Sequence, residues 1–309
     1  MGDELEALRE SVRRLLGART DPADRWAALA GIGALGILVP EDLGGGGAGL
    51  AAAVVVAEEL GRALDPSPWA SSSVGAVSAI ATAGSAAQRE RWLPAIADGT
   101  LVATLAADGP AIVMHAAAAQ LFIAPDGAVY EAPAVEVEPL DAIDPTRGLG
   151  TVRLPPEPSD RLDGDLAEAV DHLRVALVAD AVGCAAAAME AAVDYAKERV
   201  QFGVPIGSFQ AVQHLCADML RDVELARAAV DEAVALADAR HPDRHRAALL
   251  AKAFAGEALP RVSANAMQVF GGVGFTWEHD AHRWHRRLLA LDGLLGTSGQ
   301  HLDELSSLI

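Results

Sequence analysis

Residues 199–210 read RVQFGVPIGSFQ, and this stretch decides how the rest of the chain is organised. On either side of it, at about 166–188 and 212–230, apolar residues recur every three or four positions. That spacing places the apolar side chains on one face of a helix. Glycine and proline interrupt both patterns, so we expect a turn that joins two long helices. A third long helix is expected over 243–270 with shorter helices after it, and long helices with short connections form a bundle.

A second unusual stretch, QVFGGVGFTWE at 268–278, follows the third long helix. Like 199–210, it is a glycine-rich interhelical turn beside an Arg or Gln side chain. Such a turn presents backbone N–H groups and a guanidinium to an anion, which suits a phosphate. The alternative is that glycine and proline only end the helices. Either stretch alone favours that alternative, but both together in one bundle favour a phosphate-binding role.

The chain before the bundle divides into two parts. The first has helical periodicity, with helices expected at about 5–16, 22–30, 49–63, 70–83 and 86–97. The second has short apolar runs typical of strands, at 101–105, 120–124, 129–130, 135–137 and 151–154. Asp126-Gly127 suits a hairpin turn, and the prolines at 155–158 are expected to close the β module. We therefore predict a mainly α chain with a small β module, divided into domains at 1–100, 101–158 and 159–309.

Composition and charge exclude several classes of function. The 309 residues are 51 % hydrophobic and carry a formal net charge of −19, which repels nucleic-acid phosphates and anionic lipid. No apolar run reaches the roughly 18 residues that a membrane-spanning helix needs, and the acidic N-terminus is unlike a signal peptide. Cys184 and Cys216 lie in apolar helical patterns and are expected to be buried free thiols. We expect a soluble, cytoplasmic protein that binds neither nucleic acid nor membrane.

Three other motifs lack the neighbouring residues or elements that their usual functions require. Residues 31–36 match G-x-G-x-x-G, but a helical segment precedes them where a dinucleotide site needs a strand. The four glycines at 44–47 lack the Lys-Ser/Thr of a P-loop. Three histidines spaced by three are interleaved with arginines, and these cations disfavour a metal ion. The histidines are His279, His282 and His285. We predict no metal site.

Taken together, the chain resembles the acyl-CoA dehydrogenase family over nearly its whole length. In the N-terminal part the resemblance rests on GILVPEDLGG at 36–45, AEELGR at 57–62 and QRERWLP at 88–94. In the bundle it rests on Arg-x-x-Phe-Gly within 199–210, with the glutamine that ends that stretch, and on Gln-x-x-Gly-Gly-x-Gly within 268–278. The resemblance implies an N-terminal helical domain, a middle β domain and a C-terminal four-helix bundle.

The resemblance also implies FAD, which in this family lies between subunits. The two bundle signatures reach the pyrophosphate and adenosine end of a neighbour's flavin, and Arg199 would pair with the phosphates through its planar guanidinium. The residues expected to contact FAD are Arg199, Gln201, Phe202, Phe209, Gln210, Gln268, Gly271, Gly272 and Thr297.

The chain departs from the family at the catalytic base. The family's reaction needs a carboxylate to remove the α-proton of an acyl thioester while hydride passes to the flavin. That glutamate usually precedes Gly-Thr near the C-terminus, but here the residue before Gly296 is Leu295. A second branch of the family places its base on the first long bundle helix, at the position of Leu173. Since leucine cannot accept a proton, we predict no catalytic residue; Asp292 and Asp108 remain as relocated bases in an alternative.

The middle β domain also departs from the family. Family members have a longer domain with a Thr-Glu-Pro-Gly-x-Gly-Ser-Asp-like loop and a Trp-Ile-Thr strand that hold the isoalloxazine. Here residues 104–110 stand near the position of that loop, and no Trp-Ile-Thr occurs. The resemblance therefore implies a reduced middle domain that has lost its own flavin cradle.

These features resemble the short, degenerate subunit of the α2β2 acyl-CoA dehydrogenases of bacterial steroid catabolism. The resemblance implies a catalytic paralogue as partner, a shared FAD, and a bulky, steroid-derived CoA thioester bound mainly by the partner. It also implies an electron-transfer flavoprotein or similar acceptor. Two alternatives stay open: a self-sufficient homomeric enzyme with a relocated base, and a flavin-free scaffold or regulatory paralogue.

Overall fold

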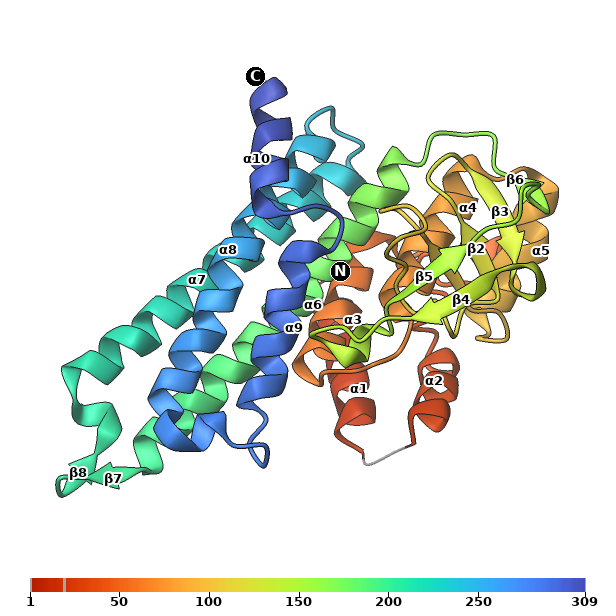
Figure 1. The fold of residues 1–309 in the computed structure, drawn as a ribbon. Coiled ribbons are helices and arrows are strands. Elements are labelled where there is room, and N and C mark those ends of the chain that lie inside the picture. The colour runs from red at the N-terminus through yellow and green to blue at the C-terminus, as the bar shows by residue number, and fades with distance from the viewer. Residues whose placement is uncertain (1, 19–20, 309) are drawn as a thin grey trace.

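Long helices dominate the chain, and the computed structural model describes residues 2–18 and 21–308. Figure 1 shows the C-terminal helices lying alongside one another as a bundle, which confirms the predicted mainly α fold with a four-helix bundle. α8 packs against α6, α7 and α9, and α10 packs against α8. The helices are α6 (Ala167–Glu198), α7 (Gln210–Asp238), α8 (Arg244–Phe270), α9 (Ala281–Gly293) and α10 (Ser298–Ser307).

α6 is the central helix of the fold. It is long and apolar enough to cross a membrane, but 78 % of its most apolar window is buried inside the protein. Alanines along it allow neighbouring helices to approach closely. This is the pattern of a core helix in a soluble protein. Cys184 on α6 is buried as expected, whereas Cys216 on α7 is only half-buried.

Two glycines allow α3 (Gly49–Arg62) to cross α6 with their backbones in contact. A Cβ built on Gly61 would lie 1.8 Å from the carbonyl oxygen of Asp180, and one on Gly183 would lie 1.8 Å from that of Glu58. Both distances are far below van der Waals contact. The AEELGR motif therefore carries a glycine at its fifth position because no larger residue fits at this crossing.

The N-terminal helices agree with the predicted periodicity, with one local difference. The expected helix over 70–83 begins as a π-helix, η2 (Ala70–Ala76), and continues as α4 (Val77–Ala83). Turns follow the end of α2 at 32–38, so the G-x-G-x-x-G motif has neither the strand nor the helix of a dinucleotide site. The remaining elements are α1 (Gly2–Gly17), α2 (Pro22–Gly31), η1 (Glu41–Leu43) and α5 (Ala86–Ala97).

The β module contains a four-stranded sheet in the order β1-β2-β3-β6 and a separate two-stranded ribbon, β4-β5. β2 and β3 form the expected hairpin, in which Gly127 adopts φ +82. A small apolar cluster of its own, including Phe122 and Tyr130, stabilises the module. The strands are β1 (Ala103–Leu105), β2 (Leu121–Ile123), β3 (Ala128–Glu131), β4 (Glu136–Pro139), β5 (Gly150–Arg153) and β6 (Asp160–Arg161).

The prolines at 155–158 do not close the sheet, contrary to the expectation. β6 lies beyond them and pairs with β3 through Ala128↔Arg161 and Val129↔Asp160. The expectation was wrong because proline interrupts a ladder only where it sits. A two-residue edge strand can re-enter the sheet after the chain has passed through a proline-rich loop.

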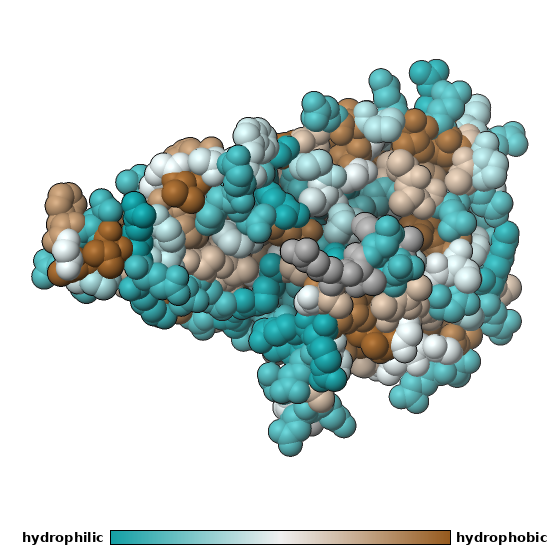
Figure 2. Space-filling model, turned by 90° about the horizontal axis from the view of Figure 1, so that it is seen from below, coloured by the Kyte–Doolittle hydropathy of each residue, from teal (hydrophilic) through white to brown (hydrophobic). Residues whose placement is uncertain are grey.

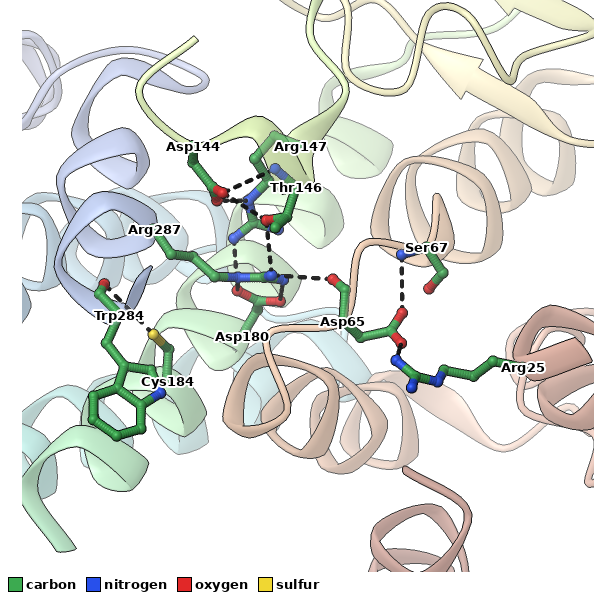
Figure 3. Close-up of polar contacts among 10 residues, drawn as sticks. All are labelled: Arg25, Asp65, Ser67, Asp144, Thr146, Arg147, Asp180, Cys184, Trp284 and Arg287. Carbon is green, nitrogen blue, oxygen red and sulfur yellow. Dashed lines mark hydrogen bonds and ion pairs between the residues drawn. The ribbon is translucent and has the colours of Figure 1, made fainter. Parts of the chain in front are cut away.

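A buried ion-pair network joins the N-terminal part, the β module and the bundle. Figure 3 shows the guanidinium groups of Arg147 and Arg287 directed toward the Asp180 carboxylate of α6. Arg287 of α9 approaches it with Nε at 3.0 Å and Nη2 at 2.6 Å, and Nη2 of Arg147 lies 2.6 Å away. Arg287 also donates to the carbonyl oxygen of Asp65, which lies between α3 and η2.

The network also determines the charge of Asp180. Burial alone would raise the pKa of Asp180, but the charges of Arg147 and Arg287 outweigh burial and lower it. All three side chains are at least 95 % buried. The carboxylate is therefore ionised and fully paired inside the protein.

Candidate functional site

The stretch 199–210 forms a β-hairpin at the junction of α6 and α7. β7 (Val200–Gln201) pairs with β8 (Val204–Pro205) across a two-residue turn of Phe202 and Gly203, whose φ angles are +54 and +85. Positive φ at both central positions is the geometry of the tight turns that match strand twist. The turn was predicted, but the hairpin within it was not.

The hairpin exposes apolar and cationic side chains together. Phe202 is 93 % exposed and packs edge-on against Phe209, with 6.1 Å between ring centroids. The backbone of Arg199 is fixed, because its N–H donates to Tyr195 and its carbonyl accepts from Ile206. Its exposed side chain makes no hydrogen bond or ion pair with any residue that the structure describes.

The stretch 268–278 lies at the end of α8 and continues as η6 (Gly271–Phe275). Gly271 adopts φ +61, and a Cβ built on Gly271 or Gly272 meets nothing within 4 Å. The backbone here is thus open to a ligand or partner. Phe275 and Trp277 are 71 % and 79 % exposed.

The two stretches share one end of the bundle, which we call the bundle tip (residues 199–210 and 268–278). Tyr195 at the end of α6 and Phe270 at the end of α8 are in edge contact, with centroids 5.3 Å apart. In Figure 1 the tip lies at the end of the bundle away from the β module, and Figure 2 shows hydrophobic atoms at this narrow end. The tip therefore gathers these FAD-contact candidates: Arg199, Gln201, Phe202, Phe209, Gln210, Gln268, Gly271 and Gly272.

Thr297 does not lie with these residues. It caps α10, accepting a hydrogen bond from the Gln300 N–H while Gln300 Oε1 accepts one from the Thr297 N–H. α9 separates it from the tip. Within one chain, Thr297 belongs to the turn in which Leu295 occupies the position expected for the catalytic base.

That turn, residues 294–298, holds Leu295 in a fixed and buried position. Leu295 has φ +57, is 5 % exposed, and donates its N–H to Oδ2 of Asp108 at 2.9 Å. Gly296 follows with φ +95, and its carbonyl accepts a hydrogen bond from Lys252 Nζ at 3.0 Å. Lys252 was not identified from the sequence, although it is one of only two lysines in the chain.

Asp292, the other carboxylate near the turn, is also used as an acceptor. Its Oδ1 accepts from the N–H of Ser298 at 2.8 Å and from the Ser298 hydroxyl at 2.6 Å. Asp108 and Asp292 thus both hold the turn in place. The structure gives these two candidate bases a positioning role.

Leu173, at the other base position, is fully buried in the apolar core. Its Cδ2 lies 3.1 Å from a Cβ built on Gly75 of the π-helical segment. Neither Leu173 nor Leu295 provides a group that accepts a proton.

The three histidines face different partners. His279 Nδ1 accepts from the N–H of Ala281, His285 Nδ1 lies 2.9 Å from the Ser263 hydroxyl, and His282 packs against Trp277. Within residues 2–18 and 21–308 no group of three or more His, Cys, Asp or Glu residues could hold a metal ion.

Family models match most of the chain. The acyl-CoA dehydrogenase N-terminal domain matches residues 2–100, and the acyl-CoA dehydrogenase C-terminal domain matches residues 165–307. Between the two matches lies the β module.

Curated and solved relatives agree with these matches. The chain is 35 % identical to "Acyl-CoA dehydrogenase IpdE2" of Mycobacterium tuberculosis, over 99 % of this chain and 97 % of that protein. A solved structure of a Tcur3481–Tcur3483 steroid acyl-CoA dehydrogenase variant superposes with a TM-score of 0.91 at 30 % identity, covering 99 % and 98 % of the two chains. The ChsE4–ChsE5 complex from Mycobacterium tuberculosis gives a TM-score of 0.86 at 25 % identity, covering 99 % and 95 %.

Proposed function

The chain belongs to the acyl-CoA dehydrogenase family, and we propose that it is the non-catalytic subunit of a heteromeric, FAD-dependent member of that family. The observation that carries the proposal is a contrast between two sites. Both base positions hold buried leucines, whereas the bundle tip keeps an exposed arginine that has no partner among the described residues. A supporting subunit needs a surface that contacts a neighbouring subunit, but it does not need a catalytic base of its own.

The bundle tip has the chemistry to hold the pyrophosphate and adenosine end of a partner's FAD. The guanidinium of Arg199 would bind the phosphates, and the open backbone at Gly271 and Gly272 allows close approach. The exposed rings of Phe202 and Phe209 would exclude water from the contact. FAD itself, when bound, accepts the hydride from the acyl thioester.

The relatives support a paralogous partner and a bulky substrate. The Tcur3481–Tcur3483 protein is described as a steroid acyl-CoA dehydrogenase, and ChsE4–ChsE5 is described as a complex. By analogy, this chain would join a catalytic paralogue in an α2β2 assembly that desaturates a steroid-derived CoA thioester. An electron-transfer flavoprotein or similar acceptor, a cytoplasmic location and the three-domain division belong to the same proposal.

The geometry disfavours the two alternatives. A self-sufficient enzyme needs a carboxylate placed to remove the α-proton, whereas Asp108 and Asp292 each use one oxygen to hold the turn in place. A flavin-free scaffold has no need for an arginine that the described residues leave unpaired, at the same end of the bundle as two open glycines.

The proposal is tested by measuring FAD per chain, first for the protein alone and then for the protein co-expressed with a neighbouring dehydrogenase paralogue. We expect no flavin on the chain alone and about one FAD per pair of unlike subunits in the complex. Stoichiometric FAD with turnover on the lone chain would support the self-sufficient enzyme. A flavin-free complex would support the scaffold.

The Leu295→Glu variant is expected to restore no acyl-CoA oxidation to the lone chain. The substitution supplies a carboxylate, but the reduced β module still lacks the flavin cradle. Activity is measured by dye reduction with short, medium and steroid-derived CoA thioesters, and Leu295→Gln serves as the control of equal size without a base. Turnover of Leu295→Glu well above Leu295→Gln would show that only the base was missing.

A further inference from the structure

The turn at 294–298 and the loop after β1 are tied together by a single side chain. Asp108, in the loop, accepts the N–H of Leu295 at 2.9 Å, and the two residues are 187 positions apart in sequence. Under the proposed function, on which this inference rests, the loop stands where a flavin cradle is reduced and the turn stands where a base is missing. The hydrogen bond therefore spans the two sides of this chain's own former reaction site.

Lys252 supports the same turn from inside the protein. Its side chain is completely buried, and its Nζ donates to the carbonyl of Gly296, the residue after Leu295. Burial lowers the pKa of Lys252 to about 8, although the nearby carboxylates of Asp292 and Asp108 act to raise it. Because the turn contacts this amine through the Gly296 carbonyl, opening of the turn is expected to increase the access of a reagent to Lys252.

The turn has further anchors on α8 and α10. Asp292 holds Ser298, and a Cβ built on Gly256 would lie 2.3 Å from the Ser298 hydroxyl, so α8 packs directly beneath this contact. His301 of α10 is buried nearby, where burial and the positive charge of Lys252 lower its pKa to about 4. It is therefore neutral at pH 7.

The backbone of Leu295 needs these anchors. A φ of +57 is uncommon for any residue except glycine, and a non-glycine residue keeps it only where the surroundings impose it. The hydrogen bonds on the Leu295 N–H and on the carbonyl of the following residue, Gly296, hold the conformation in which the leucine side chain enters the core. Loss of the bond to Asp108 would free the side of the turn that faces the β module.

We propose that Asp108 is a latch that holds the 294–298 turn closed against the β1 loop and over Lys252, sealing this chain's own reaction site. Asp108 is a positioning residue, and the group it positions is the Leu295 peptide. The latch is then a third barrier to chemistry in this chain, beside the absent base and the reduced flavin cradle. It is a contact between two domains that holds the site shut.

Amine labelling tests the latch directly, because the chain contains only two lysines. Lys197 is exposed on α6 and serves as the internal standard, while Lys252 is buried. The full-length protein is treated briefly with acetic anhydride, and acetylation at each lysine is measured by peptide mass spectrometry. In the wild type we expect rapid labelling of Lys197 and slow labelling of Lys252.

The Asp108→Ala variant is expected to increase the labelling of Lys252 relative to Lys197 by roughly tenfold or more. This is the factor by which losing one charge-assisted hydrogen bond changes a local opening equilibrium. Asp108→Asn keeps an acceptor oxygen but not the charge, and is expected to label between the wild type and Asp108→Ala. Equal labelling of both lysines in the wild type, or no change in Asp108→Ala, would overturn the proposal.

Hydrogen exchange of the Leu295 amide provides a second measurement that does not depend on Lys252. We expect this amide to be protected in the wild type, to exchange roughly tenfold or more faster in Asp108→Ala, and to exchange at a rate between the two in Asp108→Asn. An unprotected amide in the wild type would overturn the latch. The FAD content of the complex does not enter these measurements, so failure of the latch and failure of the proposed function are distinguishable.

Discussion

The Asp180→Asn variant is expected to have a free energy of unfolding about 3–5 kcal/mol below that of the wild type, the usual cost of removing one partner from a buried ion pair. The introduced amide would be neutral, yet the guanidiniums of Arg147 and Arg287 would remain buried at 96 % and 98 %. Neither arginine can lose its proton at accessible pH. Two buried positive charges would therefore lose the carboxylate that now bonds both of them, and only Asp144, 3.6 Å from Nε of Arg147, would remain as a buried counter-charge.

The matched control is Glu190→Gln, which removes a carboxylate from the Arg62–Glu190 pair at the surface. That pair is equally short, at 2.6 Å, but Glu190 is 51 % exposed. Water replaces the lost interaction, so the expected loss is about 0–1 kcal/mol. Urea unfolding of both variants gives the comparison. If Asp180→Asn lost no more stability than Glu190→Gln, the buried network would contribute no more to the free energy of unfolding than a surface ion pair does.

The lowered pKa of the Asp180 carboxylate predicts how the free energy of unfolding depends on pH. The pKa of Asp180 is lowered in the folded protein, so its contribution is fully present above the ordinary pKa of an aspartate. The contribution is lost as the pH falls through the lowered folded value. The wild type should therefore lose its advantage over Asp180→Asn on acidification, and the urea midpoints of the two proteins should converge.

The Arg199→Ala variant is expected to weaken FAD retention in the complex by roughly 10- to 100-fold, the range for losing a charge-assisted hydrogen bond. The side chain is exposed and has no partner among the described residues, so its removal costs the chain itself little stability. The measurement is the FAD that remains bound after dilution and gel filtration of the complex.

Lys197→Ala is the control for Arg199→Ala. Lys197 lies two residues earlier, is exposed, and pairs with Asp194 on its own helix. Its removal changes the net charge by the same amount but leaves the tip intact. Retention of FAD that is equal in the two variants would contradict a specific role for Arg199.

Periodicity predicted the helices well because the apolar stripe of a helix is local in sequence. The hairpin at 200–205 was missed because two-residue strands are too short to show alternation, and the π-helical start of the segment at 70–83 has the same apolar content as an α-helix. β6 was missed because the prolines before it look like the end of a sheet.

The site was only partly visible from the sequence. The register of Gly296-Thr297 identified Leu295 directly, and two glycine-rich signatures identified the tip. The latch and the ion network could not be found in the same way, because their partners are far apart. Asp108 meets Leu295 across 187 positions, and Asp180 meets Arg287 across 107. Only the packing of α9 against the rest of the fold brings them together.

The tip and the sealed turn lie at opposite ends of α9, whose 13 residues span about 20 Å at 1.5 Å per residue. Mutations at one end therefore leave the other end's geometry intact. A duplicated gene could lose its chemistry at the turn, one substitution at a time, while selection kept the tip for the benefit of the sister copy. The distance along one helix makes such a division of labour between paralogues accessible by gradual evolution.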